Sequence, residues 1–217
     1  RREGRETTQA EKDNWKEIFR IISMIRDEIQ ENLPYKVVQV DGAEADDIIG
    51  TLTQETQEFG KHEPVMIVSA DKDFVQLQKY NNVKQYSPMQ SKMVTEKNPH
   101  TYLFEHILKG DSGDGVPNVL SPDDVFVSGD RQKPVTRKKI DYWTEHAQNL
   151  ETVMDSETYR NFKRNQALVD LEQTPYDLRQ EIINTYEQQP ETPKNLVLKY
   201  LIAKRCKNLI GEIEDFY

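Results

Sequence analysis

PVMIVSADKDF, at residues 64–74, is an apolar run that ends in two aspartates. The continuous apolar side chains of residues 65–68 are typical of a strand that is buried on both faces, as in a parallel sheet. Side chains two apart on an extended chain point the same way, so Asp71 and Asp73 would both project beyond the carboxyl end of this strand. Because α/β folds place their sites at that end of the sheet, the stretch predicts both the fold and the place of its chemistry.

The residues on either side of this strand alternate between helix and strand patterns. Apolar residues recur at three and four along 13–32 and 44–59, which predicts two helices, and a short helix is expected at 74–80. YKVVQV at 35–40 and NVKQYS at 82–87 predict two further strands. Such alternation is typical of a parallel sheet with right-handed crossovers.

After Pro99 the alternation stops and helical patterns dominate. Glycine, proline, serine and aspartate between 111 and 134 indicate a loop, and helices are expected at 100–109, 136–149, 155–170, 176–188 and 193–209. We therefore predict an α/β fold in which a mostly parallel sheet is flanked by helices and followed by a smaller helical lobe. The predicted domains are an α/β core at 1–119 and a helical lobe at 120–217.

Six carboxylates form three short clusters, each at the edge of a predicted element. They are Glu44 and Asp46 in EADD, Asp71 and Asp73 in SADKDF, and Asp111 and Asp114 in GDSGDG. Gathered at one place, six acids would repel each other strongly unless a cation neutralised them. Oxygen ligands favour Mg²⁺ or Mn²⁺, whereas zinc usually recruits cysteine or histidine, and no two histidines of this chain show H-x-x-x-H spacing.

Each cluster also has a purely structural explanation. Glu44 and Asp46 lie at a helix start, and Asp73 precedes the next helix, so both clusters could simply cap helices. A cap needs one acid, however, and that role leaves Asp71 unexplained. GDSGDG alone is ordinary turn sequence, and Pro122 at the twelfth loop position excludes a calcium EF-hand. The clusters gain their meaning from falling at three successive element ends.

Composition limits the classes of protein that the chain can belong to. It has 217 residues, 35% of them hydrophobic, one cysteine and a formal charge of −9. No apolar run approaches the length of a membrane span and no signal peptide is evident, so we expect a soluble, cytoplasmic protein without a membrane partner.

The negative total argues against a nucleic-acid partner, but bound divalent ions would offset part of it, and the basic residues are clustered. The candidate contacts are Arg1, Arg2, Arg5, Lys133, Arg137, Lys138 and Lys139. A solvated charge run is the alternative explanation for each cluster.

Taken together, four segments resemble the structure-specific 5′-nuclease (flap endonuclease) family, and most of all its T-even phage branch, the phage ribonuclease H. They are EADDII at 44–49, SADKDFVQLQKY at 69–80, NVKQYSPM at 82–89 and ILKGDSGDGVP at 107–117. The resemblance covers residues 1 to 119 with good specificity and the remainder more thinly. It implies that residues 1–119 are a nuclease core and that residues 120–217 are a DNA-binding lobe.

The resemblance implies a metal-dependent nuclease that removes RNA primers and 5′ flaps during DNA replication. It implies that Asp46, Asp71, Asp73, Asp111 and Asp114 are catalytic and hold two Mg²⁺ ions, directly or through water, with Glu44 beside them and Mn²⁺ as a substitute. The implied partners are DNA and RNA–DNA duplexes with 5′ ends or flaps, together with replisome proteins such as a single-stranded-DNA-binding protein and a sliding clamp. The implied location is the cytoplasm of a phage-infected bacterial cell.

This chain departs from the family pattern in two places. The family's first strand and a second upstream segment each supply an acid, so we expect a segment before Arg1 to provide at least one more strand and the remaining ligands. Arg1, Arg2 and Arg5 would then belong to the family's basic arch. VPNVLSPDDVFVSG at 116–129 stands where the family has a glycine hairpin that holds a potassium ion and a DNA phosphate, so the basic stretch at 131–139 becomes our candidate for duplex contact.

Two other functions fit part of the sequence. VMIVSADKDF also fits a phosphohydrolase of the haloacid-dehalogenase type, although Val75 stands where that family usually has threonine and EADD has no role in it. A non-catalytic, metal-dependent DNA-binding fragment is the second alternative. Cleavage of a small phosphomonoester or of a forked DNA would separate the first from a nuclease, and binding without cleavage would indicate the second.

Overall fold

The structure is a computed structural model that describes residues 8–58, 61–190 and 193–216. Its contacts divide these residues into two compact units, one of residues 42–180 and one that joins residues up to 41 with residues from 181 onward. The predicted boundary between 119 and 120 concerns the roles of the two parts and stays a prediction. Arg1, Arg2 and Arg5 lie outside the described residues.

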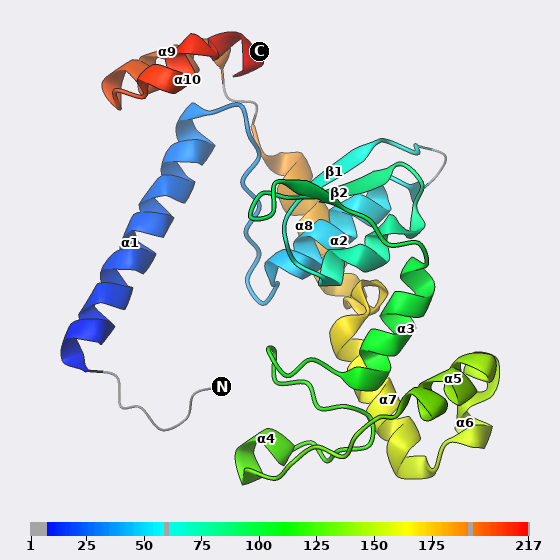
Figure 1. The fold of residues 1–217 in the computed structure, drawn as a ribbon. Coiled ribbons are helices and arrows are strands. Elements are labelled where there is room, and N and C mark those ends of the chain that lie inside the picture. Colours follow the sequence, from blue (N-terminus) through cyan, green and yellow to red (C-terminus); the bar gives the residue numbers. More distant parts are fainter. Residues whose placement is uncertain (1–7, 59–60, 191–192, 217) are drawn as a thin grey trace. The chain divides into compact units, whose positions relative to one another are not determined.

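The unit of residues 42–180 carries the sheet and most of the helices (Figure 1). Its elements are α2 (Ala45–Glu55), β1 (Val65–Val68), the 3₁₀ helix η2 (Asp73–Lys79), β2 (Val83–Ser87), β3 (Lys92–Val94), α3 (Pro99–Lys109), α4 (Val125–Ser128), α5 (Arg137–Glu145), η3 (Ala147–Asn149), α6 (Leu150–Val153), α7 (Ser156–Val169), η4 (Leu171–Gln173) and the start of α8 (Tyr176–Gln188).

The sheet has the order β1-β2-β3. β1 pairs with β2 in parallel, with Val65 opposite Val83, and β3 adds an antiparallel edge that the sequence patterns did not predict. The α/β class, with helices around a small sheet and a helical region after it, is confirmed. η2 and the three elements α5, η3 and α6 replace the single helices predicted at 74–80 and 136–149, and the short α4 lies in the predicted loop.

The strand predicted at 35–40 is wrong, because this segment pairs with no strand among the described residues. Instead, the side chain of Gln189 forms hydrogen bonds with the backbone of Val37 in this segment. The Val37 N–H donates to Gln189 Oε1 at 2.8 Å, and the Gln189 side-chain amide donates to the Val37 carbonyl. The β-branched run therefore remains extended without joining the sheet.

Two apolar clusters hold the unit of residues 42–180 together. One joins the strands to η2 and η4 through Ile67, Phe74, Leu77, Val83 and Leu171. The other joins α3 to α5 and α7, which lie against α3 in Figure 1, and contains the fully buried Leu108. Burial of one such leucine contributes about 1.5–3 kcal/mol, so packing anchors the C-terminal half of α3.

The other unit consists of α1 (Gln9–Asn32), the end of α8, α9 (Lys194–Ala203), α10 (Lys207–Gly211) and η5 (Ile213–Phe216). The Tyr200 hydroxyl donates to Glu28 Oε2 at 2.9 Å and thereby links α9 to α1. Trp15, Phe19 and Ile22 of α1 are each more than half exposed, although the helical pattern predicted a buried face. Across the residues that the structure describes, every helix is too short or too polar to span a lipid bilayer.

The outer edge of β1 has no partner strand within the described residues. Met66 and Val68 on this strand are 51% and 64% exposed, and a cavity of about 270 Å³, lined mainly by apolar groups, separates β1 from α2. An open, apolar strand edge is a ready place for further β pairing.

Candidate metal centre

The second acidic cluster follows β1 directly. After Val68 the chain turns so that the Asp71 N–H donates to Ser69 Oγ at 3.1 Å and the Asp73 N–H donates to Asp71 Oδ1 at 3.0 Å. The buried amide of Gln85 on β2 donates to the carbonyls of Ser69 and Asp71 and so fixes the turn to the sheet. Asp71 and Asp73 therefore occupy the carboxyl end of the parallel pair, as the strand pattern predicts.

The first cluster lies at the start of α2, where its acids have different tasks. The Asp47 carboxylate accepts from the Glu44 N–H at 3.0 Å and from the Thr174 hydroxyl at 3.0 Å, so Asp47 serves the helix start. Asp46, one residue earlier, is half-buried, and the charges of Asp71 and Asp73 act on it. Glu44 is exposed beside it. Asp47 is thus the residue that caps α2, and Asp46 interacts electrostatically with the other acids.

The third cluster lies in a closed turn after α3. A backbone bridge between Asp111 and Val116 ties the turn, with N···O distances of 2.8 and 2.7 Å. Asp111 is buried, and its Oδ1 accepts from the Gly113 N–H at 2.8 Å. Asp114 is exposed at the tip of the turn, yet its charge still acts on Asp73. The turn thus brings both carboxylates into the neighbourhood of η2.

The electrostatics of these acids reflect their closeness to one another. Burial raises the pKa of Asp46 to about 6, and the charges of Asp71 and Asp73 act in the same direction. Burial, with the charges of Asp71 and Asp111, likewise raises the pKa of Asp73 to about 6. A raised carboxyl pKa means that the protein around the group disfavours its charge. The negative charges of these acids are therefore incompletely compensated by the positive groups around them.

Two residues that the sequence reasoning missed stand among the acids. The Lys72 ammonium lies 2.6 Å from Asp111 Oδ2. Although burial opposes it, the bonds from Lys72 and the Gly113 N–H hold the pKa of Asp111 down to about 2. His106 of α3 lies between Asp73 and Asp111, and burial and the Lys72 charge lower the pKa of its ring. The position of Lys72 inside DKD was a usable signal, whereas nothing in the spacing of His106 marked it.

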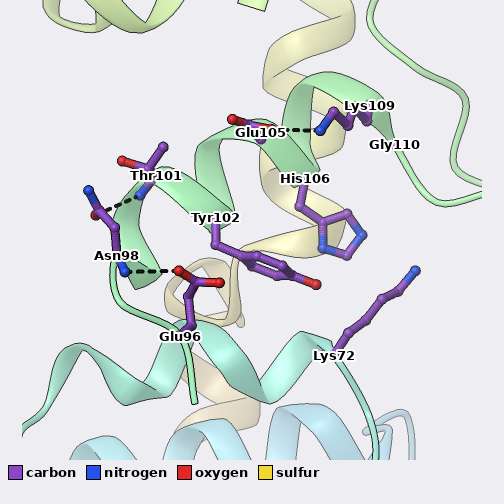
Figure 2. A pocket seen from close by; sticks show the side chains of 9 residues that line it. All are labelled: Lys72, Glu96, Asn98, Thr101, Tyr102, Glu105, His106, Lys109 and Gly110. Carbon is purple, nitrogen blue, oxygen red and sulfur yellow. Dashed lines mark hydrogen bonds and ion pairs between the residues drawn. The ribbon is translucent and has the colours of Figure 1, made fainter. Parts of the chain in front are cut away.

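A cavity of about 420 Å³ opens beside this group, along α3 and bordered by Lys72 and by Glu96 and Asn98. Figure 2 shows the ring of His106, the hydroxyl end of Tyr102 and the side chain of Lys72 gathered at one side of it. Glu105 and Lys109, which are paired at 2.6 Å, lie farther along α3. A polar group of a substrate could thus reach the acids from solvent.

Of the basic residues predicted to contact nucleic acid, the four that the structure describes lie at and just before the start of α5. Lys133, Lys138 and Lys139 are exposed. Arg137 is also exposed but is paired with Glu105 and Asp141, each at 2.7 Å. Three of these cations occupy the first turn of α5, where the helix dipole disfavours positive charge. An external anion would relieve that cost.

The residues fit a divalent cation. One ligand atom each from Asp73, His106 and Asp111 lies within 4.8 Å of the other two. Asp73 Oδ1 is buried without a hydrogen-bond partner among the described residues. A carboxylate with a raised pKa and an unsatisfied buried oxygen, as in Asp73, is what a cation would stabilise, so the described residues hold a group able to bind a metal ion.

Comparisons with known proteins agree with this geometry. Residues 98–216, more than half of the chain, match the family model described as T4 RNase H, C terminal. Residues 5–104 match the 5′-3′ exonuclease, N-terminal resolvase-like domain. The chain belongs to the T4 RNase H family of 5′ nucleases. The expected family is thereby confirmed, and the haloacid-dehalogenase alternative loses its support.

Individual relatives carry matching names. The ribonuclease H of Enterobacteria phage T4 is 29% identical over 208 residues, which are 94% of this chain and 68% of that protein. A 5′-3′ exonuclease of Buchnera aphidicola subsp. Schizaphis graminum is 37% identical over 98 residues, which are 42% of this chain and 33% of that protein. A solved structure of the T5 D15 protein, co-crystallised with metal ions, has a TM-score of 0.54 at 18% identity and covers 96% of this chain and 73% of that one, which shows the fold alone.

The family makes this chain a nuclease of the 5′-3′ exonuclease and ribonuclease H class, whose substrates are nucleic acids. The expectations for fold class and enzyme class are therefore confirmed together.

Proposed function

We propose that this chain hydrolyses phosphodiester bonds near 5′ ends or flaps in DNA and RNA–DNA duplexes, with two Mg²⁺ ions held by the acidic clusters. The observation that carries the proposal is the convergence of acids from three element ends, because their charges perturb one another across α2, η2 and the turn after α3. Mn²⁺ is expected to substitute for Mg²⁺. The setting that suits this activity is replication in the cytoplasm of a phage-infected cell, beside replisome proteins.

The proposed ligands fall into two groups by solvent exposure. Asp46, Asp73 and Asp111 are buried or half-buried, and Asp71, Asp114 and Glu44 surround them at the surface. Bound cations would lower the pKa of a water nucleophile and stabilise the leaving oxygen. The chain's own contribution is to fix the carboxylates on a rigid sheet end and a closed turn. Lys72, paired with Asp111 at 2.6 Å, compensates part of the charge and is free enough, at 52% exposure, to turn toward a phosphate.

Metal binding should stabilise the fold. Because the acids assemble only in the folded chain, millimolar Mg²⁺ is expected to raise the unfolding temperature, and a concentration 100 times the dissociation constant would add about 2.7 kcal/mol to the unfolding free energy. A melting series and titration calorimetry measure this, with NaCl at matched ionic strength as the control. Absence of both binding heat and a shift at millimolar metal would count against the site.

Cleavage separates the nuclease from a fragment that only binds DNA. With Mg²⁺, the protein is expected to release short products from a labelled 5′-flap DNA and from a 5′ RNA–DNA duplex, and to leave intact a covalently closed dumbbell duplex, which has no 5′ end. A chelator should stop the reaction. Binding of the flap substrate with no product, at a metal concentration that shifts the melting temperature, would favour the non-catalytic alternative.

The surface around Lys133 and the start of α5 is the proposed duplex contact. Replacing Lys133, Arg137, Lys138 and Lys139 with alanine is expected to weaken duplex binding and to lower the salt slope by about 0.9 for each phosphate that is no longer neutralised. The lysines should contribute more than Arg137, whose charge Glu105 and Asp141 already compensate. Fluorescence anisotropy at several salt concentrations measures both quantities.

Lys163, exposed on α7, provides the matched control. Lys163→Ala removes one charge of the same type and should leave the salt slope unchanged. Equal slopes for the quadruple variant and for Lys163→Ala would contradict the proposed contact.

A further inference from the structure

His106 is set between two of the acids in a way that its place on α3 alone does not require. Its Nδ1 lies 3.4 Å from Asp73 Oδ1, and its Nε2 lies 3.4 Å from Asp111 Oδ2. Both distances are long for a hydrogen bond but suit groups that face a shared ion. The three side chains come from η2, α3 and the turn after α3, so the tertiary fold brings them together.

The imidazole is buried and incompletely satisfied. His106 is only 9% exposed, and within the described part of the chain its Nε2 has no hydrogen-bond partner. Asp73 Oδ1 is in the same condition. Buried polar atoms in native proteins nearly always have a partner, and a bound ion is one recognised partner where protein groups supply none.

Packing fixes the direction of the ring. Tyr102, one helical turn earlier, meets it edge-on with ring centroids 6.1 Å apart and an interplanar angle of 76°. Figure 2 shows the ring extending from α3 toward the side of the cavity where Lys72 stands. The ring is thus held toward the acids before any ion arrives.

We infer that His106 is a nitrogen ligand of a divalent cation that Asp73 and Asp111 also hold. The inference rests on the proposed function and extends its all-oxygen site to a mixed one. A neutral imidazole has one nitrogen with a free lone pair, and its other N–H is typically directed at a carboxylate in metal sites. Of the two ring nitrogens, Nε2 is the one without a hydrogen-bond partner among the described residues, so it is the expected ligand atom, and Nδ1 faces Asp73 Oδ1.

A nitrogen ligand changes which metals the site prefers. Imidazole suits the later first-row ions, whereas Mg²⁺ strongly favours oxygen. His106 should therefore raise the affinity for Co²⁺ relative to Mg²⁺. We expect His106→Gln to lower the Co²⁺-to-Mg²⁺ affinity ratio by about tenfold, measured by titration calorimetry with each metal alone.

Pulsed electron paramagnetic resonance with one equivalent of Mn²⁺ tests the ligation directly. The chain has four histidines, so a variant in which His62, His100 and His146 are all glutamine leaves His106 as the sole imidazole. Grown with ¹⁵N-labelled histidine, this variant should show ¹⁵N coupling to Mn²⁺. His106→Gln should lack the coupling, and His100→Gln, a change on the exposed side of the same helix, should keep it.

The outcomes separate the inference from the proposed function. Mn²⁺ that binds without ¹⁵N coupling in the variant that retains only His106 would overturn the inference and leave the all-oxygen site standing. A chain that binds no divalent ion would overturn both. Because the deciding measurement is made on a protein that keeps the buried His106, it holds even if His106→Gln fails to fold.

Discussion

Asp73→Asn is expected to reduce cleavage of a 5′-flap or RNA–DNA substrate by about a thousandfold or more, because loss of one anionic ligand removes several kcal/mol of transition-state stabilisation. Asp71→Asn should act in the same direction. Asparagine has nearly the shape of aspartate, so the turn after β1 should persist. Substrate binding should stay within a few-fold, since phosphate contacts elsewhere supply most of the affinity.

The measurement is a single-turnover cleavage rate together with an unfolding curve without metal. Asp73 stands in a crowd of acids, so its neutral replacement should leave the unfolding free energy unchanged or raise it, whereas an ordinary disruptive substitution would lower it. Asp177→Asn, at an exposed aspartate of α8, is the matched control and should have no effect on the rate. Near-normal turnover of Asp73→Asn would remove it from the catalytic set.

Gly110→Ala is expected to destabilise the protein by about 3 kcal/mol or more and to disrupt the third acidic cluster. Gly110 has φ +64° and ψ −173°, a backbone conformation that is essentially restricted to glycine. An added Cβ would lie 2.4 Å from the Val116 carbonyl oxygen and 2.6 Å from the Pro117 carbonyl carbon. Both neighbours are backbone atoms of the closed turn, so the turn itself would have to move and Asp111 would move with it.

Gly115, in the same turn, is the control for this prediction. It also has a positive φ, +78°, but an added Cβ would meet nothing within 4 Å. Gly115→Ala should therefore cost only about 1–2 kcal/mol, the ordinary penalty of the left-handed conformation. Urea unfolding and Mg²⁺ titration of the two variants measure the difference. Equal losses of stability and of metal affinity would contradict the argued role of Gly110.

The sequence by itself determined which local elements form and where the acids fall along the chain. The apolar run at 65–68 and the acids after it are adjacent, so their relation is fixed by the geometry of an extended chain. The amphipathic periods of α2, α3 and α7 likewise depend on near neighbours only. For that reason the α/β class, the strand that leads to Asp71 and Asp73 and the three acidic clusters could all be predicted.

The tertiary structure decided which partner each polar side chain has, because the partners are distant from one another in sequence. Thr174 engages Asp47 and leaves Asp46 to the other acids, while Glu105 and Asp141 engage Arg137 in the basic stretch. Gln189 satisfies the backbone at Val37, so a β-branched segment never becomes a strand. No local pattern encodes these pairings.

His106 is the clearest example of what only the fold could reveal. On α3 it is one polar residue with no motif around it, and it meets Asp73 only because η2 packs against α3. Its burial and its unsatisfied Nε2 exist only in the folded chain. Sequence patterns report periodicity and adjacency, whereas a ligand set drawn from several elements is created by packing between them.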